Sequence, residues 1–314
     1  MKVCLALVCE NNEKFLNQVK LLLFSFRKNA GELSGIQVTL ITNAESLDNK
    51  EINFFKKHFP PINFKTMPKL GAIPHTSKLN AFYAIDPSEY DILIFMDCDT
   101  IVLRHLDNIL DPIKKNNVDF LCRRGGKTDR GNFVNFDKLV DEYCKDSQKK
   151  KVIFEGKEEY PMFNSGVFLA TSETVLKIRK NSIAFTYSLF NHWKFRRIIE
   201  NMEIFKKLLK LKILKSKKKV LIDWPIEQGA LALSCINANV KVEYLDEIYN
   251  SWGDLEDLKI LHCFKSVYKF DRRYIFSSEA EKWINEYEKS GLPGKMLLAK
   301  TIKEYKKEIL ENNY

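Results

Sequence analysis

The chain has 314 residues, of which 45% are hydrophobic and 29% are charged, a balance typical of a folded globular protein with a substantial core. This composition excludes a chain that is disordered over most of its length. The net charge is +10, but residues 193–219 hold eleven basic residues against two acidic ones, so the remainder is close to neutral. A protein that coats nucleic acid with a basic surface is thereby excluded.

The cysteines and the apolar runs indicate the compartment. Seven cysteines are scattered along the chain without a CxxC pair, which excludes a familiar zinc module and argues against a disulfide framework. Residues 1–8 are apolar but run directly into polar residues, unlike a secretory signal. No apolar run approaches the roughly 20 residues that cross a bilayer. These features predict a cytoplasmic protein.

Strand and helix patterns alternate along the chain. Strands are expected at residues 2–8, 37–42, 92–96, 118–122 and 167–170, and helices at residues 15–28, 52–59 and 78–85. Residues 92–96 are apolar throughout, as in a strand that is covered on both faces. A polar excursion with some helix is expected over residues 123–161, and helix from residue 278 onward, interrupted at 291–294. This alternation predicts an α/β domain with a largely parallel sheet.

Two aspartates, Asp97 and Asp99, follow the buried strand directly. Residues two apart in extended backbone point to the same side, so both carboxylates can share one ligand. Ligands of open α/β sheets bind beyond the carboxyl ends of the strands. Two carboxylates suit Mn²⁺ or Mg²⁺, with diphosphate oxygens and water in the remaining positions. An acidic pair in a solvated turn is the alternative, and the preceding apolar strand favours the metal site.

These aspartates belong to a series of motifs that follow one another along the chain, at residues 77–82 (SKLNAF), 94–103 (IFMDCDTIVL), 163–168 (FNSGVF), 227–231 (EQGAL) and 260–262 (ILH). The series resembles glycosyltransferase family eight, the glycogenin-like and lipopolysaccharide galactosyltransferase-like enzymes, over roughly residues 1–270. The resemblance implies the GT-A fold, a Rossmann-like mixed and mostly parallel sheet flanked by helices. It further implies transfer of a hexose from a UDP-sugar, with Mn²⁺ or Mg²⁺ as cofactor and with retention of anomeric configuration.

The resemblance can be carried over residue by residue. It implies that Asp97, Asp99 and His262 are the metal ligands, and that Gln228, Glu227 and Asn164 are catalytic, with Gln228 near the anomeric carbon. The donor-binding residues that it implies are Val8, Cys9, Phe15, Lys78, Asp97, Cys98, Asp99, Asn164, Ser165, Gly166 and Lys265. Ordinary structural roles stay open for three of them: Lys78 on a helix surface, Phe15 in the core, and Gly166 as a site of close backbone approach.

The chain departs from the family pattern at two positions. Glu227 stands where the family usually has aspartate, and Tyr268 stands where a lysine commonly follows the histidine. Lys265 and Lys269 are the nearby alternatives for binding diphosphate oxygens, and both stay open. A glutamate beside the acceptor could also act as the general base of an inverting reaction, so the stereochemistry stays open as well.

The domain organisation follows from these patterns. We expect a glycosyltransferase domain over residues 1–275, with a basic helical insertion at about 192–219, and a helical C-terminal extension over residues 276–314. Residues 193–219 combine basic residues with apolar ones near helical spacing. Such a helix lies on an anionic membrane surface or packs on the core as a solvated helix, and both alternatives stay open.

The expected partners are a UDP-sugar donor and a glycan, glycolipid or protein-linked acceptor, without nucleic acid. Peripheral contact with the cytoplasmic membrane face is an alternative location, and the oligomeric state stays open, with a homodimer among the choices. A sugar nucleotidyltransferase is a rival function, but it needs a glycine-rich loop after the first strand, where residues 10–12 are Glu-Asn-Asn. A non-catalytic glycan- or membrane-binding protein on the same fold is the other rival.

Overall fold

The structure is a computed structural model that describes residues 1–70, 74–125, 136–144, 150–211, 225–251, 255–262 and 278–311. Its centre is a seven-stranded sheet in the order β10-β6-β9-β4-β1-β2-β3. The strands are β1 (Val3–Glu10), β2 (Gln37–Asn43), β3 (Ile62–Met67), β4 (Ile92–Met96), β6 (Phe120–Arg124), β9 (Phe163–Thr171) and β10 (Val242–Leu245). Strand β9 is antiparallel to its neighbours β4 and β6, and the other strand pairs are parallel.

Two short antiparallel pairs accompany the main sheet: β5 (Thr100–Val102) with β11 (Ile260–His262), and β7 (Val152–Phe154) with β8 (Lys157–Glu159). The 3₁₀ helices are η1 (Gly31–Gly35), η2 (Pro74–Asn80), η3 (Pro87–Glu89) and η4 (Glu247–Tyr249). A short α4 (Asp111–Asn116) precedes β6, and a π-helical turn, η6 (Lys306–Leu310), follows the last α-helix.

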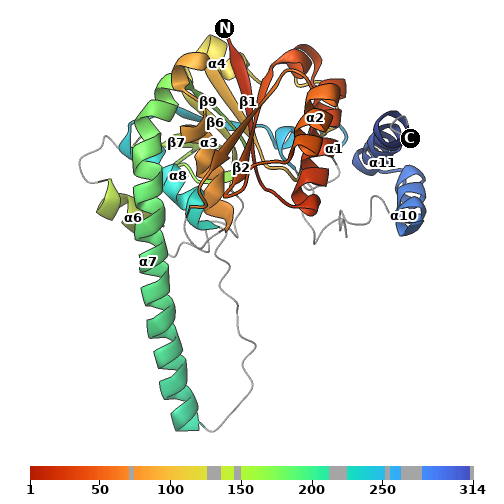
Figure 1. Cartoon of the computed structure of the whole chain (residues 1–314). Coiled ribbons are helices and arrows are strands. Elements are labelled where there is room, and N and C mark those ends of the chain that lie inside the picture. The colour runs from red at the N-terminus through yellow and green to blue at the C-terminus, as the bar shows by residue number, and fades with distance from the viewer. Residues whose placement is uncertain are drawn as a thin grey trace.

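Helices cover both faces of the sheet (Figure 1). The apolar core on one face includes α1 (Glu13–Asn29), α2 (Asn49–His58), α10 (Ser278–Glu288) and α11 (Pro293–Tyr305). The core on the other face includes α3 (Ala81–Ala84), α6 (Phe136–Tyr143), α7 (Ser172–Leu211) and α8 (Pro225–Asn237). The predicted fold class, a mixed and mostly parallel sheet flanked by helices and followed by C-terminal helices, is confirmed.

The strands follow from their apolar patterns. Along β1, Leu5 and Leu7 enter the core on the α1 face, whereas Ala6 enters the opposite core, because successive side chains of a strand alternate. All five residues of β4 are buried, as expected for a central strand that is covered on both faces. Because β1 and β4 are parallel neighbours, their carboxyl ends meet at one edge of the sheet, where Asp97 begins the next segment.

Two expected helices differ from the structure. The helix expected at residues 78–85 is instead the 3₁₀ helix η2 up to Asn80, followed by the single turn of α3. The basic segment begins in the second half of α7, a 40-residue helix that is about 60 Å long at the α-helical rise. Figure 1 shows this half running beyond the sheet. Residues 212–219 of the segment lie outside the described residues.

The C-terminal helices pack on α1. Tyr305 of α11 makes an edge contact with Phe24, with 5.4 Å between ring centroids. Nearby, the Lys28 ammonium lies 3.3 Å from Glu304 and 2.6 Å from Glu308. The division of the chain at residue 275 stays a prediction. None of the described helices combines the length and the apolar character that crossing a bilayer requires.

Candidate active site

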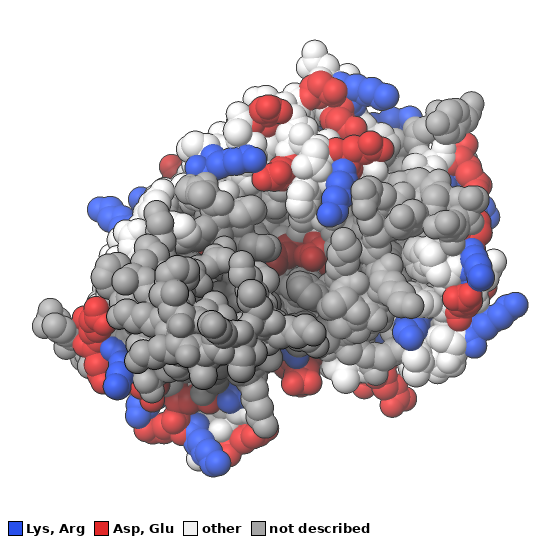
Figure 2. All heavy atoms as spheres, turned by 90° about the horizontal axis from the view of Figure 1, so that it is seen from below, with Lys and Arg blue, Asp and Glu red and all other residues white. Residues whose placement is uncertain are grey.

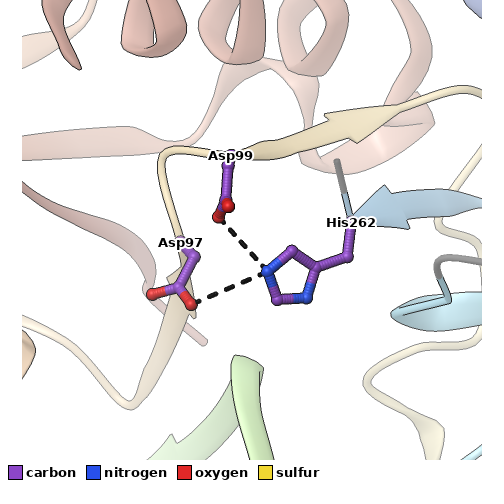
Figure 3. A group of neighbouring side chains, drawn as sticks. All are labelled: Asp97, Asp99 and His262. Carbon is purple, nitrogen blue, oxygen red and sulfur yellow. Dashed lines mark ion pairs between the residues drawn. The ribbon is translucent and has the colours of Figure 1, made fainter. Parts of the chain in front are cut away.

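The segment after β4 turns sharply and brings two carboxylates to the edge of the sheet. The backbone N–H of Asp97 donates to the Gly166 carbonyl over 2.7 Å, which anchors it to the neighbouring strand. Its own carbonyl then accepts from the Thr100 amide at 3.0 Å and from the Thr100 hydroxyl at 2.8 Å. This turn places Asp97 and Asp99 on the same side before β5 begins (Figure 3).

Strand β11 supplies a histidine to the same place. His262 is paired in register with Thr100 of β5, the residue that follows Asp99. Its Nε2 lies 3.2 Å from Asp99 Oδ1 and 4.0 Å from Asp97 Oδ2 (Figure 3). One ligand atom from each of the three side chains lies within 4.8 Å of the others. Two carboxylate oxygens and an imidazole nitrogen are a donor set that fits a divalent metal ion.

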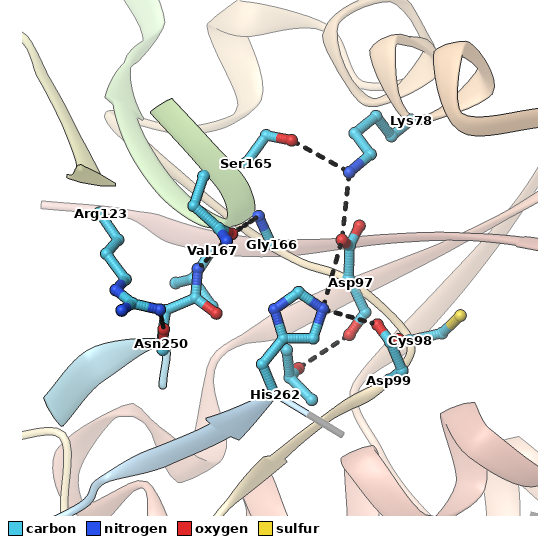
Figure 4. Close-up of polar contacts among 12 residues, drawn as sticks. Lys78, Asp97, Cys98, Asp99, Arg123, Ser165, Gly166, Val167, Asn250 and His262 are labelled. Carbon is cyan, nitrogen blue, oxygen red and sulfur yellow. Dashed lines mark hydrogen bonds and ion pairs between the residues drawn. The ribbon is translucent and has the colours of Figure 1, made fainter. Parts of the chain in front are cut away.

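A lysine whose side chain is largely buried borders this group. The Lys78 ammonium donates to Asp97 Oδ2 and to Ser165 Oγ, each over 3.1 Å (Figure 4). It also lies 3.2 Å from Glu227 Oε1. Burial lowers the pKa of Lys78, but the carboxylates of Asp97 and Glu227 outweigh it and leave this pKa above its ordinary value. The lysine is therefore a fixed cation between the acidic groups, and its side chain does not lie on an exposed helix surface.

Burial also shifts the ionisation of the metal-binding candidates. The pKa of Asp97 is raised because burial disfavours its charged form, despite the attraction of the Lys78 ammonium. Burial lowers the pKa of His262, but the adjacent Asp99 carboxylate more than compensates and raises it. A bound cation would favour ionised carboxylates and a neutral imidazole, because these are the forms that ligate metals.

Helix α8 contributes the next pair of residues. Glu227 and Gln228 lie in its first turn and are 2% and 5% exposed. Glu227 Oε1 accepts from Ser165 Oγ over 2.8 Å. Neither Glu227 Oε2 nor Gln228 Oε1 has a hydrogen-bond partner among the described residues, although both are buried. Two unpaired buried oxygens beside a carboxylate–lysine pair indicate a site that receives donors from a ligand.

An irregularity in β9 shapes the floor of the site. The register between β6 and β9 shifts at Cys122, so that Arg123 pairs with Asn164 and residues 165–167 are passed over. This irregularity presents Ser165 to Lys78 and lets the imidazole of His262 approach Gly166 closely. A Cβ on that glycine would lie 2.5 Å from His262 Cε1, so only glycine fits here.

The residues expected to hold the nucleotide come from β1 and α1, and β1 is the parallel neighbour of β4. Val8 and Cys9 are buried at the end of β1, where burial raises the pKa of the Cys9 thiol to about 12. Phe15 is partly buried against the core in the first turn of α1, after the N-cap Asn12. Cys98 links the two regions by donating from its thiol to Gln18 Oε1 of α1 over 3.2 Å.

Of the remaining expected residues, Asn164 is among the described residues, whereas the two lysines after His262 are not. Asn164 lies beside the metal group, where its Oδ1 accepts from the Gly166 amide at 3.1 Å and from Asn250 Nδ2 at 3.0 Å. Lys265 and Lys269 lie outside the described residues. The structure also brings in Asn250, whose carbonyl accepts from Arg123 at 2.6 Å. No sequence pattern marks Asn250 or Arg123, since each stands in a segment without a motif.

Figure 2 shows the molecule from below, with acidic side chains visible in a hollow near the middle of this face. Basic and acidic residues alternate around the described part of this face, without a large patch of one sign.

The comparisons with solved structures give distant likenesses. The galactosyltransferase LgtC in complex with donor and acceptor sugar analogs matches at 13% identity and a TM-score of 0.44, over 79% of this chain and 74% of that one. An active-site mutant of LgtC matches at 12% identity and 0.44 over the same shares. The apo structure of the bifunctional glycosyltransferase WbbM matches at 14% identity and 0.42, over 87% of this chain and 44% of that one.

No family model matches the chain, and no curated protein matches its sequence. All three structures are glycosyltransferases by name. At these TM-scores, the case for a function rests on the residues and geometry of this chain.

Proposed function

We propose that this protein is a metal-dependent glycosyltransferase that transfers a hexose from a UDP-sugar to a glycan, glycolipid or protein-linked acceptor. The observation that carries the proposal is the convergence of Asp97, Asp99 and His262 at the carboxyl end of β4, beside the ion pair of Lys78 and Glu227. A cation and a sugar pocket side by side are what a nucleotide-diphosphate sugar requires, because its diphosphate and its hexose are adjacent.

Asp97, Asp99 and His262 would hold the metal, with Mn²⁺ as the preferred ion and Mg²⁺ as the alternative. A divalent ion there supplies positive charge that neutralises the departing nucleoside diphosphate. The protein's own contribution is preorganisation: Lys78 is already bound to Asp97 and Glu227, so the carboxylates do not have to reorganise around the donor. Lys265 or Lys269 remains the candidate for a further contact with the diphosphate.

The buried oxygens on α8 are suited to a sugar. Glu227 Oε2 and Gln228 Oε1 need hydrogen-bond donors, and the hydroxyl groups of a hexose supply them. Glu227 Oε1 is already occupied by Ser165 and Lys78, which favours a role in orienting the sugar over a role as a general base. We therefore propose retention of anomeric configuration, with Gln228 near the anomeric carbon and Asn164 lining the pocket.

Two rival functions are disfavoured by specific residues. A sugar nucleotidyltransferase needs a glycine-rich loop after the first strand, whereas residues 10–12 lead into α1 through the N-cap of Asn12. A non-catalytic glycan-binding protein has no need of a buried cation site beside its sugar pocket. For location, we propose a cytoplasmic enzyme that contacts an anionic membrane through residues 193–219, where a lipid-linked acceptor would be presented.

Donor hydrolysis tests the proposal without knowledge of the acceptor. The protein is incubated with UDP-glucose, UDP-galactose, UDP-N-acetylglucosamine and a GDP-sugar, with Mn²⁺ or with chelator, and the released nucleotide is measured. We expect release of UDP from one UDP-sugar only when metal is present. Asp97→Asn or Asp99→Asn should lower this rate on the order of a thousandfold, because the charge stabilisation of the leaving group is lost.

The matched control is Asp91→Asn, which removes the same charge at the opposite end of β4 and should leave the rate unchanged. Asp91 lies just before the strand, and its carboxylate accepts from the backbone N–H of Lys2. Near-wild-type turnover by Asp97→Asn or Asp99→Asn in chelator would show that no metal acts at this site.

A further inference from the structure

Asn250 lies behind the candidate metal ligands and is held from two sides. It is fully buried, with 0% of its surface exposed, directly after η4. Its Nδ2 donates to Asn164 Oδ1 over 3.0 Å, and its backbone carbonyl accepts from Arg123. Because Nδ2 is committed to Asn164, the orientation of the amide is set and its Oδ1 points elsewhere.

Two buried polar atoms at this point are complementary, because an amide oxygen accepts a hydrogen bond and an imidazole N–H donates one. Neither Asn250 Oδ1 nor His262 Nδ1 has a hydrogen-bond partner among the described residues. Both border the backbone of Gly166, since a Cβ placed there would lie 2.7 Å from Nδ1 and 3.1 Å from Oδ1. Figure 4 shows the imidazole and the amide facing each other beside this glycine. An unpaired polar atom in the interior is unfavourable, so both atoms need a hydrogen-bond partner.

We propose that Asn250 is a positioning residue for His262, and that its Oδ1 accepts the Nδ1–H of the imidazole, directly or through one water, when Nε2 binds the metal. A neutral imidazole carries one N–H, so a ring that binds metal through Nε2 keeps its proton on Nδ1. Metal-binding histidines nearly always donate that second N–H to an oxygen acceptor, which fixes the ring and its tautomer. Among the described residues, Asn250 offers the acceptor.

The same side chain also orients Asn164. Asn164 Oδ1 accepts from both Asn250 Nδ2 and the Gly166 amide, so its own Nδ2 is turned away from them. Asn250 thus joins the metal group to the residue proposed to line the sugar pocket. The inference rests on the proposed function in one respect, which is that His262 belongs to a metal site.

The test is the affinity for Mn²⁺ alone, measured by electron paramagnetic resonance of the free ion during titration, without any donor. Asn250→Ala removes the acceptor and should lower the affinity about 10- to 100-fold, as is usual when the partner of a metal-binding histidine is lost. Asn250→Asp keeps an oxygen acceptor at the same position and should stay within a few fold of the wild type.

A buried amide pair elsewhere supplies the matched control. Asn80 Nδ2 donates to Asn43 Oδ1 over 3.0 Å and also to the Pro68 carbonyl. Asn80→Ala should therefore lower the thermal stability much as Asn250→Ala does, yet leave the Mn²⁺ affinity unchanged. This comparison separates loss of a buried asparagine from loss of the His262 partner.

The outcomes are distinguishable. Equal Mn²⁺ affinity of Asn250→Ala and the wild type, or equal losses in Asn250→Ala and Asn250→Asp, would overturn the role of Asn250. No Mn²⁺ binding by the wild type would instead overturn the proposed metal site. If Asn250→Ala does not fold, Asn250→Leu takes its place, because leucine fills a similar volume without a polar atom. A Mn²⁺ affinity of Asn250→Leu equal to that of Asn250→Asp would then overturn the role of Asn250.

Discussion

At the residue scale, the chemistry of this site depends on side chains that no single motif contains. The pair Asp97 and Asp99 could be predicted as metal ligands because a buried strand precedes it. The partner of Asn164 could not be predicted, since Asn250 stands 86 residues further along the chain in a segment without periodicity. The burial of Lys78 was equally hidden, because one lysine next to a helical pattern usually lies on the surface.

The contacts of Gly166 explain why the segment FNSGVF has a glycine at this position. Its carbonyl accepts from the Asp97 amide, and its missing Cβ makes room for His262. The glycine therefore fixes the distance between β9 and both sides of the metal group. From the sequence, a close approach of the backbone was the alternative to donor binding for this glycine, and the identity of the approaching group required the structure.

Gln228 tests whether the start of α8 faces the sugar or the nucleotide. We expect Gln228→Ala to lower the turnover of the donor while the affinity for UDP stays within a few fold. The reason is that Gln228 Oε1 is a buried acceptor in the same turn as Glu227, which contacts Ser165 and Lys78, whereas the residues proposed for the base lie on β1 and α1. Titration calorimetry with UDP and Mn²⁺ measures the affinity, and released UDP measures the turnover.

A matched change at the other end of the same helix controls for effects on α8 as a whole. Ser234 is buried, and its hydroxyl donates to the Ala230 carbonyl within the helix, so Ser234→Ala removes a polar group without touching the first turn. Abolished UDP binding in Gln228→Ala, with normal binding in Ser234→Ala, would move Gln228 to the nucleotide site.

At the element scale, central strands could be predicted well and irregular ones poorly. β4 coincides with the expected residues because five consecutive apolar side chains leave few alternatives. β3 was not expected, since it lies at the sheet edge and only its first residue, Ile62, is buried. The shift in β9 was equally unpredictable, because a bulge depends on the partner strand and leaves no local signal.

The last helix offers a test of whether the C-terminal extension is part of the main core. Leu298 of α11 is 0% exposed and lies in the same apolar core as β1 and α1, whereas Leu292, just before the helix, is 41% exposed. We expect Leu298→Ala to lower the free energy of unfolding by about 2–5 kcal/mol, because it leaves a cavity in that core.

Leu292→Ala removes the same atoms from the surface and should change the free energy of unfolding by less than about 0.5 kcal/mol. Denaturant unfolding of both variants, followed by circular dichroism, gives the two values. If Leu298→Ala lowers the stability only in a separate unfolding transition at low denaturant, α10 and α11 form an independent unit beside the domain.

At the scale of the whole molecule, the fold class follows from alternating elements and the location of the site from the sheet-edge rule. The long reach of α7 could not be predicted, because residues 172–192 and 193–211 differ in composition and read as separate segments. Figure 1 shows the second part extending away from the sheet, and residues 193–211 carry six basic residues against two acidic ones.

This arrangement leads to a prediction about the membrane. Lysines near an anionic bilayer contribute about 1 kcal/mol each, so neutralising Lys206, Lys207, Lys210 and Lys212 together should weaken binding on the order of a thousandfold at low salt. Cosedimentation with vesicles that contain phosphatidylglycerol measures the binding. It should also fall as salt rises, because the charges are screened. Hydrolysis of the soluble donor should persist in this variant, since the four lysines are not among the proposed site residues.

The matched control neutralises four exposed lysines of the C-terminal segment, Lys282, Lys289, Lys300 and Lys307, and so makes the same change in net charge. If attraction depends on the basic segment, only the first variant loses vesicle binding. Equal losses in both variants would mean that the overall charge of +10 attracts the protein without a specific docking segment. Equal sedimentation of the wild type with neutral and anionic vesicles would mean that residues 193–219 have no electrostatic role at a membrane, and that a lipid-linked acceptor has to be reached in another way.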